Sequence, residues 1–333
     1  MNYKNNKKIN MIDLFSGAGG LTLGFVKQNF SPIFTVENWK DALETYNFNF
    51  KTNVLPKDIT DANVINEIES MNSMAELVIG GFPCQGFSMA GKRSKDDPRN
   101  KLYEYTIDVI VKTQPKVFVL ENVKGILSYK ENDGIYVIDK IKNLLNNNNY
   151  YVNHILLDAS KFGVPQKRER VIFIGSTSQN KHLVDIVINN LKNTNFKIKT
   201  VRDAIYDLED KTNDEIPNHT ITNHSLEMKK RLLEIPEGKS LYKDYSDAFR
   251  KLYYDKPSYT VKENHGGVHV HPVKGRVLTP RELARLQSFP DDFIFLGTKS
   301  STLKQIGNAV PVGLAEVIAK DIRKVFFTSD NEK

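Results

Sequence analysis

Short apolar runs alternate with longer mixed segments through the first half of this chain. The runs are of strand length and lie at residues 9–15, 32–36, 77–79, 117–120, 154–157 and 171–174. Stretches with a helical pattern lie between them, at residues 21–29, 41–46, 62–71, 102–112 and 135–145. Because strands that alternate with helices usually form parallel sheets, the pattern predicts an α/β fold with a doubly wound, mostly parallel sheet.

The alternation stops near residue 176, and the chain stays polar, with short irregular apolar pieces, to about residue 272. A helical pattern returns at residues 279–287, where Thr279 is the expected cap and Pro280 occupies the first turn. A last helix is expected over residues 312–327, which place their apolar side chains on one face. We therefore predict a first domain at residues 1–176, a smaller inserted domain at 177–275, and a C-terminal segment at 276–333 that returns to the first domain.

Composition narrows the class of protein. The 333 residues are 40% hydrophobic, which is enough for a core that needs no disulfide or metal. No apolar run approaches the roughly 18 residues of a membrane span, and residues 1–8 lack the apolar core of a signal peptide. A cytoplasmic protein without membrane contact is therefore expected. The net charge of +7 favours a polyanionic partner but does not identify nucleic acid by itself.

Cys84 is the single cysteine, and it follows the apolar run 77–79 in a loop rich in glycine and proline. Most lone cysteines inside cells are inert buried residues. This one is expected at the carboxyl edge of the sheet, where α/β proteins bind their ligands. Because a free thiol is only slightly ionised at neutral pH, a nucleophilic role needs a neighbour that lowers its pKa or takes up charge.

A glycine-rich loop, residues 13–21, follows the first predicted strand and opens the first helix. Its spacing is not GxGxxG, which disfavours a cofactor that carries a pyrophosphate. Glu37 ends the second strand, at the position where an acidic side chain binds ribose hydroxyls in nucleoside-binding sheets. Asp58 and Ile59 are expected at the end of a third strand, beside an adenine, and Trp39 either stacks on the base or packs in the core. An adenosyl ligand without diphosphate, such as S-adenosylmethionine, fits this pattern.

Glu121 follows four apolar strand residues, which places a carboxylate in the same crevice as Cys84. Gln166, Arg168 and Arg170 precede the apolar run 171–174, and their spacing puts the three side chains on one side of an extended chain. A charge run of this kind is usually a solvated face. Here it is also suited to bring two guanidinium groups toward a carboxylate and a nucleic-acid backbone.

The order of these segments closely resembles that of the DNA (cytosine-5) methyltransferases of the bacterial restriction-modification type. The resemblance covers residues 11–175 and about 257–325 and leaves the middle of the chain unmatched. The matching segments are residues 13–21, Glu37, residues 58–59, Pro83-Cys84-Gln85, Glu121-Asn122-Val123, the set Gln166, Arg168 and Arg170, residues 281–290 and residues 305–311. Their shared order carries the resemblance, since each alone can arise by chance.

The resemblance implies a sequence-specific enzyme that transfers a methyl group from S-adenosylmethionine to C5 of a cytosine in duplex DNA. Cys84 would add to C6 of the ring while Glu121 hydrogen-bonds or protonates N3, and Arg168 and Arg170 would orient Glu121 and the base. Because the ring cannot be reached from both sides inside a duplex, the target cytosine must leave the stack. No metal is required, and the sequence holds no His/Cys ligand cluster.

The resemblance also assigns the binding residues. The cofactor set is Phe15, Ser16, Gly17, Ala18, Gly19, Gly20, Leu21, Glu37, Asn38, Trp39, Asp58, Ile59, Pro83, Leu102, Asn308, Ala309 and Val310. The DNA set is Gln85, Ser88, Lys92, Arg93, Arg99, Gln166 and Thr260. Residues 87–101 would close over the flipped base, and residues 177–275 would form the target-recognition domain. Candidate base-reading residues there are His219, His224, Lys229, Lys230, Arg231, Lys262, Asn264 and His265, none of which stands out from an ordinary polar surface residue.

Two features depart from the family pattern. Family members often carry an aromatic residue directly after the ribose-binding glutamate, whereas here Asn38 stands there and Trp39 follows. The middle region is also modest in length, which favours a short recognition sequence.

Three alternatives stay open. A tRNA cytosine-5 methyltransferase shares the scaffold but typically has a second cysteine in its recognition region. A nicotinamide-dependent oxidoreductase fits the sheet and Glu37 but lacks the GxGxxG loop. A non-catalytic DNA-binding protein on the same fold would not need the intact Cys84 and Glu121 segments. On the favoured interpretation the partner is double-stranded DNA, the enzyme is a monomer, and a cognate restriction endonuclease would act on the same site without a stable complex.

Overall fold

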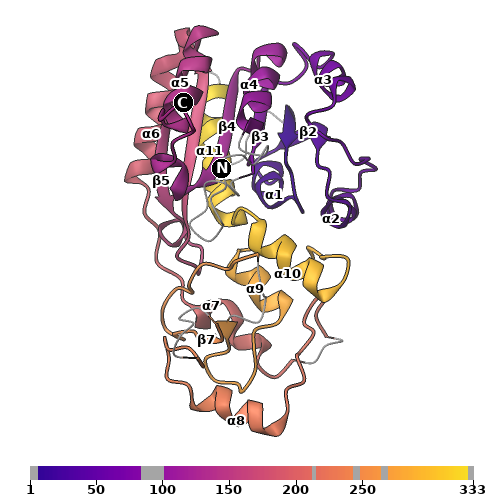
Figure 1. The fold of residues 1–333 in the computed structure, drawn as a ribbon, viewed down its shortest axis with the longest axis vertical. Coiled ribbons are helices and arrows are strands. Elements are labelled where there is room, and N and C mark those ends of the chain that lie inside the picture. The colour runs from indigo at the N-terminus through magenta and orange to yellow at the C-terminus, as the bar shows by residue number, and fades with distance from the viewer. Residues whose placement is uncertain (1–6, 84–100, 212–214, 243–247, 264–268, 329–333) are drawn as a thin grey trace.

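The computed structural model describes residues 7–83, 101–211, 215–242, 248–263 and 269–328 (Figure 1). A six-stranded sheet in strand order β2-β1-β3-β4-β6-β5 forms the upper part of the molecule. Its strands are β1 (Ile9–Leu14), β2 (Phe30–Val36), β3 (Leu77–Gly80), β4 (Val117–Val123), β5 (Tyr150–Asp158) and β6 (Glu169–Thr177). The first four strands pair in parallel, and β6 runs antiparallel to both β4 and β5. The sheet is therefore mostly parallel, as predicted.

Helices cover both faces of this sheet, because the strands are apolar on both sides. One core joins alternate residues of the strands, such as Met11 and Ile79, to α1 (Gly20–Val26), α6 (Lys181–Asn193) and α11 (Val312–Phe327). The other core joins the intervening residues, such as Ile12 and Val78, to α3 (Ala62–Glu69), α4 (Leu102–Thr113) and α5 (Val137–Asn147). Two buried faces are characteristic of parallel sheets. The doubly wound α/β architecture is confirmed.

The lower part of Figure 1 holds the shorter elements. They are α7 (Val201–Ile205), α8 (Leu226–Glu234), the parallel pair β7 (Arg250–Lys251) and β8 (His269–Val270), α9 (Pro280–Leu286) and α10 (Lys299–Asn308). A third hydrophobic core lies here and includes residues of α7, α9 and α10. The remaining elements are α2 (Lys40–Phe50) and the short 3₁₀ helices η2 (Lys124–Ser128), η3 (Ala159–Phe162), η4 (Ser178–Asn180) and η5 (Tyr206–Leu208).

The C-terminal segment returns to the sheet, as the sequence predicts. From the lower part the chain runs up through α11, which packs against α1 and α6 (Figure 1). Gly24 of α1 allows the close approach, since a Cβ atom there would lie 2.4 Å from the Ala315 Cβ and 2.6 Å from the Glu316 backbone nitrogen. The first and last parts of the chain therefore share one core.

Two local expectations differ from the structure. Helix α6 lies in the stretch expected to be irregular, and Val184, Val187 and Leu191 bury its apolar face against the sheet and α11. The domain boundary at residue 176 stays a prediction. Helix α6 begins after this boundary but packs against β5 and β6 of the sheet. The strand expected before Asp58 is absent, since residues 52–58 form an irregular connection and β3 begins at Leu77. Within the described residues, no helix has the length and apolar character to cross a bilayer.

Candidate active site

Glu121 lies in β4 with its carboxylate held by Arg170 of β6. The Arg170 Nε atom is 2.6 Å from Glu121 Oε1, and both side chains are largely buried, at 12% and 13% exposure. In the antiparallel register Glu121 lies opposite Ile172 and Arg170 lies opposite Val123, so the two charged residues are diagonal neighbours on one face. The paired register of β4 and β6 therefore aims the guanidinium at the carboxylate, as expected for this pair.

The segment that leads to Cys84 runs beside this carboxylate. Because β3 and β4 are parallel and Gly80 pairs with Leu120, Gly81 comes next to Glu121. A Cβ atom on Gly81 would lie 3.2 Å from Glu121 Oε2, and the Asn122 side chain donates a 3.0 Å hydrogen bond to the Phe82 carbonyl. The amide of Asn122 thus fixes the start of the loop against β4. Cys84 itself lies outside the described residues.

The glycine-rich loop and Glu37 meet at the carboxyl ends of β1 and β2. The Gly17 amide donates to Glu37 Oε2 at 2.8 Å, and the Trp39 amide donates to Oε1 at 2.7 Å. Burial raises the pKa of Glu37, while these backbone hydrogen bonds act to lower it. Gly17 has φ +54°, and a Cβ atom there would meet no atom within 4 Å. The loop therefore has open space beside a fixed carboxylate, as a ribose site requires.

The C-terminal segment closes the other side of the loop. A Cβ atom on Gly20 would lie 2.5 Å from the Val310 carbonyl oxygen and 3.0 Å from the Ala309 Cβ, so the two segments touch. Asn308, the last residue of α10, is exposed at this junction. Segments from the two ends of the sequence thus lie side by side, and together they are suited to hold an adenosyl cofactor.

Asn38, Asp58 and Trp39 lie on the same side of the sheet, although no third strand delivers Asp58. The Lys57 amide donates to the Glu37 carbonyl at 2.9 Å and so brings residues 57–59 to the end of β2. Hydrogen bonds from Thr60, with a further one from Asn38, lower the pKa of Asp58. Asn38 and Asp58 are exposed and available to a ligand. The ring of half-buried Trp39 lies under the Lys304 ammonium, 4.6 Å from it, a contact that the sequence did not indicate.

The remaining cofactor candidates differ in exposure. Phe15 lies at the turn after β1 with φ +54°, and it is half-buried, like Pro83 and Leu102. Ser16, Ala18 and Gly19 are buried in the loop. The side chains of Leu21 and Ile59 belong to the hydrophobic cores, which leaves their backbones for contact with a ligand.

Asp13, directly before the loop, was not predicted as a functional residue. Its side chain is fully buried beneath α1, where Oδ2 accepts a 2.5 Å hydrogen bond from the Thr22 hydroxyl and a 3.4 Å bond from the Tyr46 hydroxyl. Oδ1 is buried without a hydrogen-bond partner. Burial raises the pKa of Asp13 to about 7. A sequence signal for Asp13 does exist. It is an acidic residue at the end of a buried strand, shortly before a threonine in the following helix.

Gln166 is buried among protein groups, which disfavours the predicted contact with DNA. Its side chain is fully buried, with Oε1 accepting from the Val261 amide at 2.8 Å and Nε2 donating to the Leu286 carbonyl and to Gln287 Oε1. The amide therefore satisfies protein groups and has no face toward solvent.

Arg168 is also buried, with 2% exposure. Its guanidinium donates to the carbonyl oxygens of Val261 at 2.7 Å and Gly307 at 2.8 Å. Arg170 is therefore the arginine seen to hold Glu121. Arg168 joins Val261, in the predicted inserted domain, to Gly307, in the C-terminal segment.

Of the other DNA candidates, Thr260 is half-exposed and donates to the Lys167 carbonyl at 2.8 Å. Gln85, Ser88, Lys92, Arg93 and Arg99 lie outside the described residues, as do Asn264 and His265. His219 is fully buried and bonded to the Thr279 hydroxyl, so it cannot read bases. His224 and Lys229 are half-buried, and Lys230, Arg231 and Lys262 are exposed.

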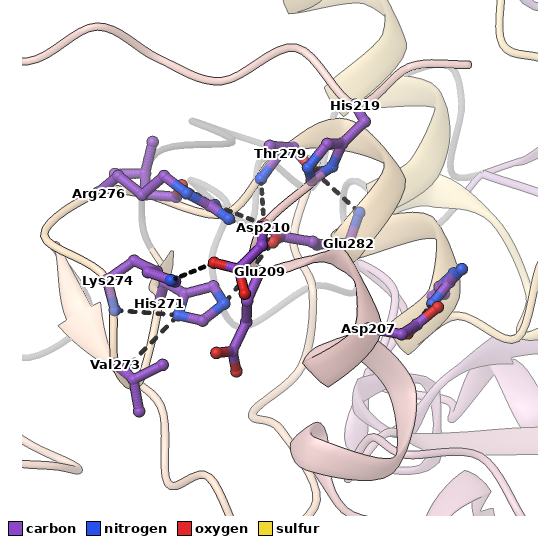
Figure 2. A network of polar contacts seen from close by, with 12 residues as sticks. Asp207, Glu209, Asp210, His219, His271, Val273, Lys274, Arg276, Thr279 and Glu282 are labelled. Carbon is purple, nitrogen blue, oxygen red and sulfur yellow. Dashed lines mark hydrogen bonds and ion pairs between the residues drawn. The ribbon is translucent and has the colours of Figure 1, made fainter. Parts of the chain in front are cut away.

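Within the lower part, a buried polar network joins His219, His271 and Arg276 to the first turn of α9 (Figure 2). Arg276 forms two hydrogen bonds with Glu282, at 2.7 and 2.8 Å, and Glu282 also accepts from the Thr279 amide. Arg276 is the main cause of the lowered pKa of Glu282, acting against burial. His271 lies 3.7 Å from Glu282, and burial lowers the pKa of its imidazole to about 4. The ion pair at the centre is compensated in charge and serves to hold the fold.

The described residues contain no group of three or more His, Cys, Asp or Glu side chains suited to a metal ion. The arrangement instead places a fixed carboxylate, the segment that leads to Cys84, and the glycine-rich loop with Glu37 at one edge of the sheet.

Comparisons with known proteins agree with this arrangement. A family model described as C-5 cytosine-specific DNA methylase matches residues 9–324. Type II methyltransferase M1.HphI of Haemophilus parahaemolyticus is 39% identical over 332 residues, covering 94% of this chain and 86% of that protein. Type II methyltransferase M.DdeI of Desulfomicrobium norvegicum is 33% identical over 371 residues, covering 96% and 89%.

Solved structures give the same result for the fold. A protein named as a DNA modification methyltransferase of an E. coli prophage superposes with a TM-score of 0.79 at 29% identity, over 96% of this chain and 99% of that one. The methyltransferase EhMeth of Entamoeba histolytica superposes with a TM-score of 0.68 at 19% identity, over 96% and 98%, which concerns the fold alone.

Proposed function

The chain belongs to the C-5 cytosine-specific DNA methylase family, and we propose that it transfers a methyl group from S-adenosylmethionine to C5 of a cytosine flipped out of duplex DNA. Cys84 is the proposed nucleophile and Glu121 the proposed acid and hydrogen-bond partner of the ring. The names of its relatives, type II methyltransferases, support a place in a restriction-modification system.

One observation carries the proposal. The Glu121 carboxylate is held by Arg170 at 2.6 Å and lies against Gly81, three residues before Cys84. A thiolate that adds to C6 of cytosine places charge on the ring unless N3 is protonated or hydrogen-bonded at the same time. A carboxyl group fixed beside the thiol loop meets this need, since general acid–base catalysis requires the group within hydrogen-bond reach of the proton it moves.

The proposed reaction proceeds by addition to the cytosine ring followed by elimination. A bond forms between the Cys84 sulfur and C6, N3 receives a hydrogen bond or proton from Glu121, and the electron pair of the C5–C6 bond becomes nucleophilic at C5. C5 takes the methyl group, and the methyl donor leaves as the neutral thioether S-adenosylhomocysteine. C5 then loses its proton to a base, N3 returns its proton or hydrogen bond to Glu121, and the sulfur–C6 bond breaks, which restores the ring and the Cys84 thiolate. S-adenosylmethionine, when bound, supplies the electrophilic methyl group. Arg170 keeps Glu121 in one orientation throughout.

The cofactor fits the residues at the ends of β1 and β2. Open space beside Gly17 and the carboxylate of Glu37 suit a ribose, and Asp58 and Asn38 suit the polar edge of an adenine. Asn308, Ala309 and Val310 would close the site from the C-terminal side. The ring of Trp39 would need to exchange its contact with Lys304 for one with the base.

Double-stranded DNA is the proposed substrate, contacted by residues of the proposed recognition domain, which include Thr260. The chain would act as a monomer. A cognate endonuclease would recognise the same DNA sequence without forming a stable complex with this protein. Base flipping is required because the reacting carbons are stacked inside a duplex.

Transfer of a labelled methyl group tests the proposal. Purified protein with labelled S-adenosylmethionine is expected to label duplex DNA and to leave tRNA unlabelled, and base-resolution mapping is expected to find 5-methylcytosine within one short sequence. The variant Cys84→Ala should bind the same duplex but label nothing. Label on tRNA, label on no nucleic acid, or full turnover by Cys84→Ala would each reject the proposal.

A further inference from the structure

Two buried glutamines meet where the sheet, α9 and α10 come together. Gln166 precedes β6 and Gln287 follows the last turn of α9, and neither side chain has any exposed surface. The Gln166 Nε2 atom donates to Gln287 Oε1 at 2.8 Å. A buried amide costs free energy unless it is paired, so the two side chains depend on one another and on the groups around them.

The pair extends into a continuous chain of hydrogen bonds. At one end, the Val261 amide donates to Gln166 Oε1 at 2.8 Å. At the other, Gln287 Nε2 donates to the Ile306 carbonyl at 2.7 Å and the Ala309 carbonyl at 3.3 Å. Every donor points the same way, from Val261 through both glutamines to Ala309. Such an ordered chain polarises its members and fixes both amides in one orientation.

The row of hydrogen bonds ends, on both sides, in a functional segment of the proposed site. Val261 follows Thr260, the DNA candidate, and Ala309 belongs to the cofactor candidates. A second buried link runs in parallel, since Arg168 joins the carbonyls of Val261 and Gly307. The backbones also touch, because a Cβ atom on Gly307 would lie 2.3 Å from the Lys262 carbonyl oxygen. Movement of one segment must therefore move the other or break the hydrogen bonds that join them.

We propose that Gln166 and Gln287 are positioning residues that couple cofactor binding to DNA binding. Occupation of residues 308–310 by the cofactor holds Ala309 in place, and the amide chain transmits that position to Val261 and the DNA-facing Thr260. The inference rests on the proposed function of both segments. Coupling of this kind is reciprocal, so DNA must tighten cofactor binding by the same factor by which cofactor tightens DNA binding.

The coupling factor is measured directly. The dissociation constant of S-adenosylhomocysteine, which binds without reacting, is determined by calorimetry with and without a duplex that carries the mapped site. In the wild type we expect the duplex to tighten binding about tenfold, equivalent to about 1.4 kcal/mol. Gln166→Met and Gln287→Met keep side-chain volume but break the row of amide hydrogen bonds. In each, the factor should fall to about threefold or less, because only the Arg168 link and the backbone contact remain. The double variant should lose no more of the coupling factor than either single variant, because both changes break the same row of hydrogen bonds.

Gln305→Met is the matched control. Gln305 is equally buried in α10, but its amide donates to Leu296 and Ser301, both within the C-terminal segment, so these bonds do not join the two functional segments. This variant should lose thermal stability as the other two do and keep the wild-type coupling factor. Equal coupling in all variants, or a wild type without coupling, overturns the inference. A wild type that binds no cofactor or methylates no DNA rejects the proposed function instead.

Discussion

Asp13 shows what burial does to a single carboxyl group in this molecule. It sits under α1 with one oxygen bonded to Thr22 and Tyr46 and the other without a partner. Because the charged form is poorly solvated there, burial raises its pKa from 3.8 to about 7. Between these two values the folded protein binds a proton that the unfolded chain has released, and the folded state loses stability as the pH rises.

The variant Asp13→Asn tests this assignment. Asparagine cannot ionise, so its free energy of unfolding relative to that of the wild type should rise from pH 5 to pH 7 and level off above pH 7. The slope should approach about 1.4 kcal/mol per pH unit. Urea unfolding of both proteins across this range measures it. A difference that is constant with pH, or that changes in the opposite direction as the pH rises, contradicts the assignment.

Glu121 gives the second prediction at this scale. Glu121→Gln removes the acid while keeping the side-chain shape, and we expect the rate of methyl transfer to fall about 10²- to 10⁴-fold, as for loss of a general acid. Binding to the duplex should change little, because the carboxylate acts on the extruded ring. Glu169→Gln, an exposed neighbour paired with Lys124, is the control and should keep wild-type rates. A fall of less than tenfold in Glu121→Gln would count against its role.

The limits of sequence reasoning are also clearest in single residues. The Glu121 and Arg170 pair was predictable because strand neighbours and alternation place both on one face. The partners of Gln166 and Arg168 lie 93 to 139 residues away, in segments whose placement depends on the whole fold. Their polarity and charge favoured contacts with a ligand, whereas in the structure both side chains are buried among protein groups.

At the scale of elements, a local signal predicted the start of α9. Thr279 caps α9 with Pro280 at its first turn, as the sequence predicts, and Glu282 completes a capping box. Helix α10 begins with a simpler cap, in which the Thr298 hydroxyl accepts from the Ser301 amide. The α9 cap differs because the buried Glu282 also binds Arg276, and Thr279 also contacts His219.

These two caps should differ in energy. Thr298→Ala is expected to lower the free energy of unfolding by about 1 kcal/mol, an ordinary cap loss, and Thr279→Ala by about 2 kcal/mol, because the buried His219 also loses its bond to the hydroxyl. Urea unfolding followed by circular dichroism measures both. A smaller loss for Thr279→Ala than for Thr298→Ala would show that the Figure 2 network contributes nothing through Thr279.

Elements that depend on distant packing were predicted less well. The apolar spacing of α6 was present in the sequence, at Val184, Val187 and Leu191, but the polar stretch around it concealed the pattern. The strand expected before Asp58 failed for the opposite reason. Residues 52–58 reach the sheet edge through a backbone hydrogen bond to Glu37, and no strand is needed to place them there.

At the scale of the molecule, the site exists only because the chain returns to its start. The glycine loop touches Val310, and α1 packs against α11 through Gly24. The order of motifs predicted this return, since the final segment resembles a cofactor-binding one. The amide chain from Val261 to Ala309 was not predictable, because it joins separate segments through side chains whose partners no local pattern identifies.

The proposed reaction depends on a covalent bond between Cys84 and the target base. A duplex with 5-fluorocytosine at the mapped position, incubated with the protein and S-adenosylmethionine, tests this most directly, because fluorine at C5 cannot leave as a proton does. Intact mass measurement is expected to find one DNA strand attached to the wild type through Cys84, and none attached to Cys84→Ala. A wild-type protein that methylates normal duplex but forms no such adduct would contradict the account.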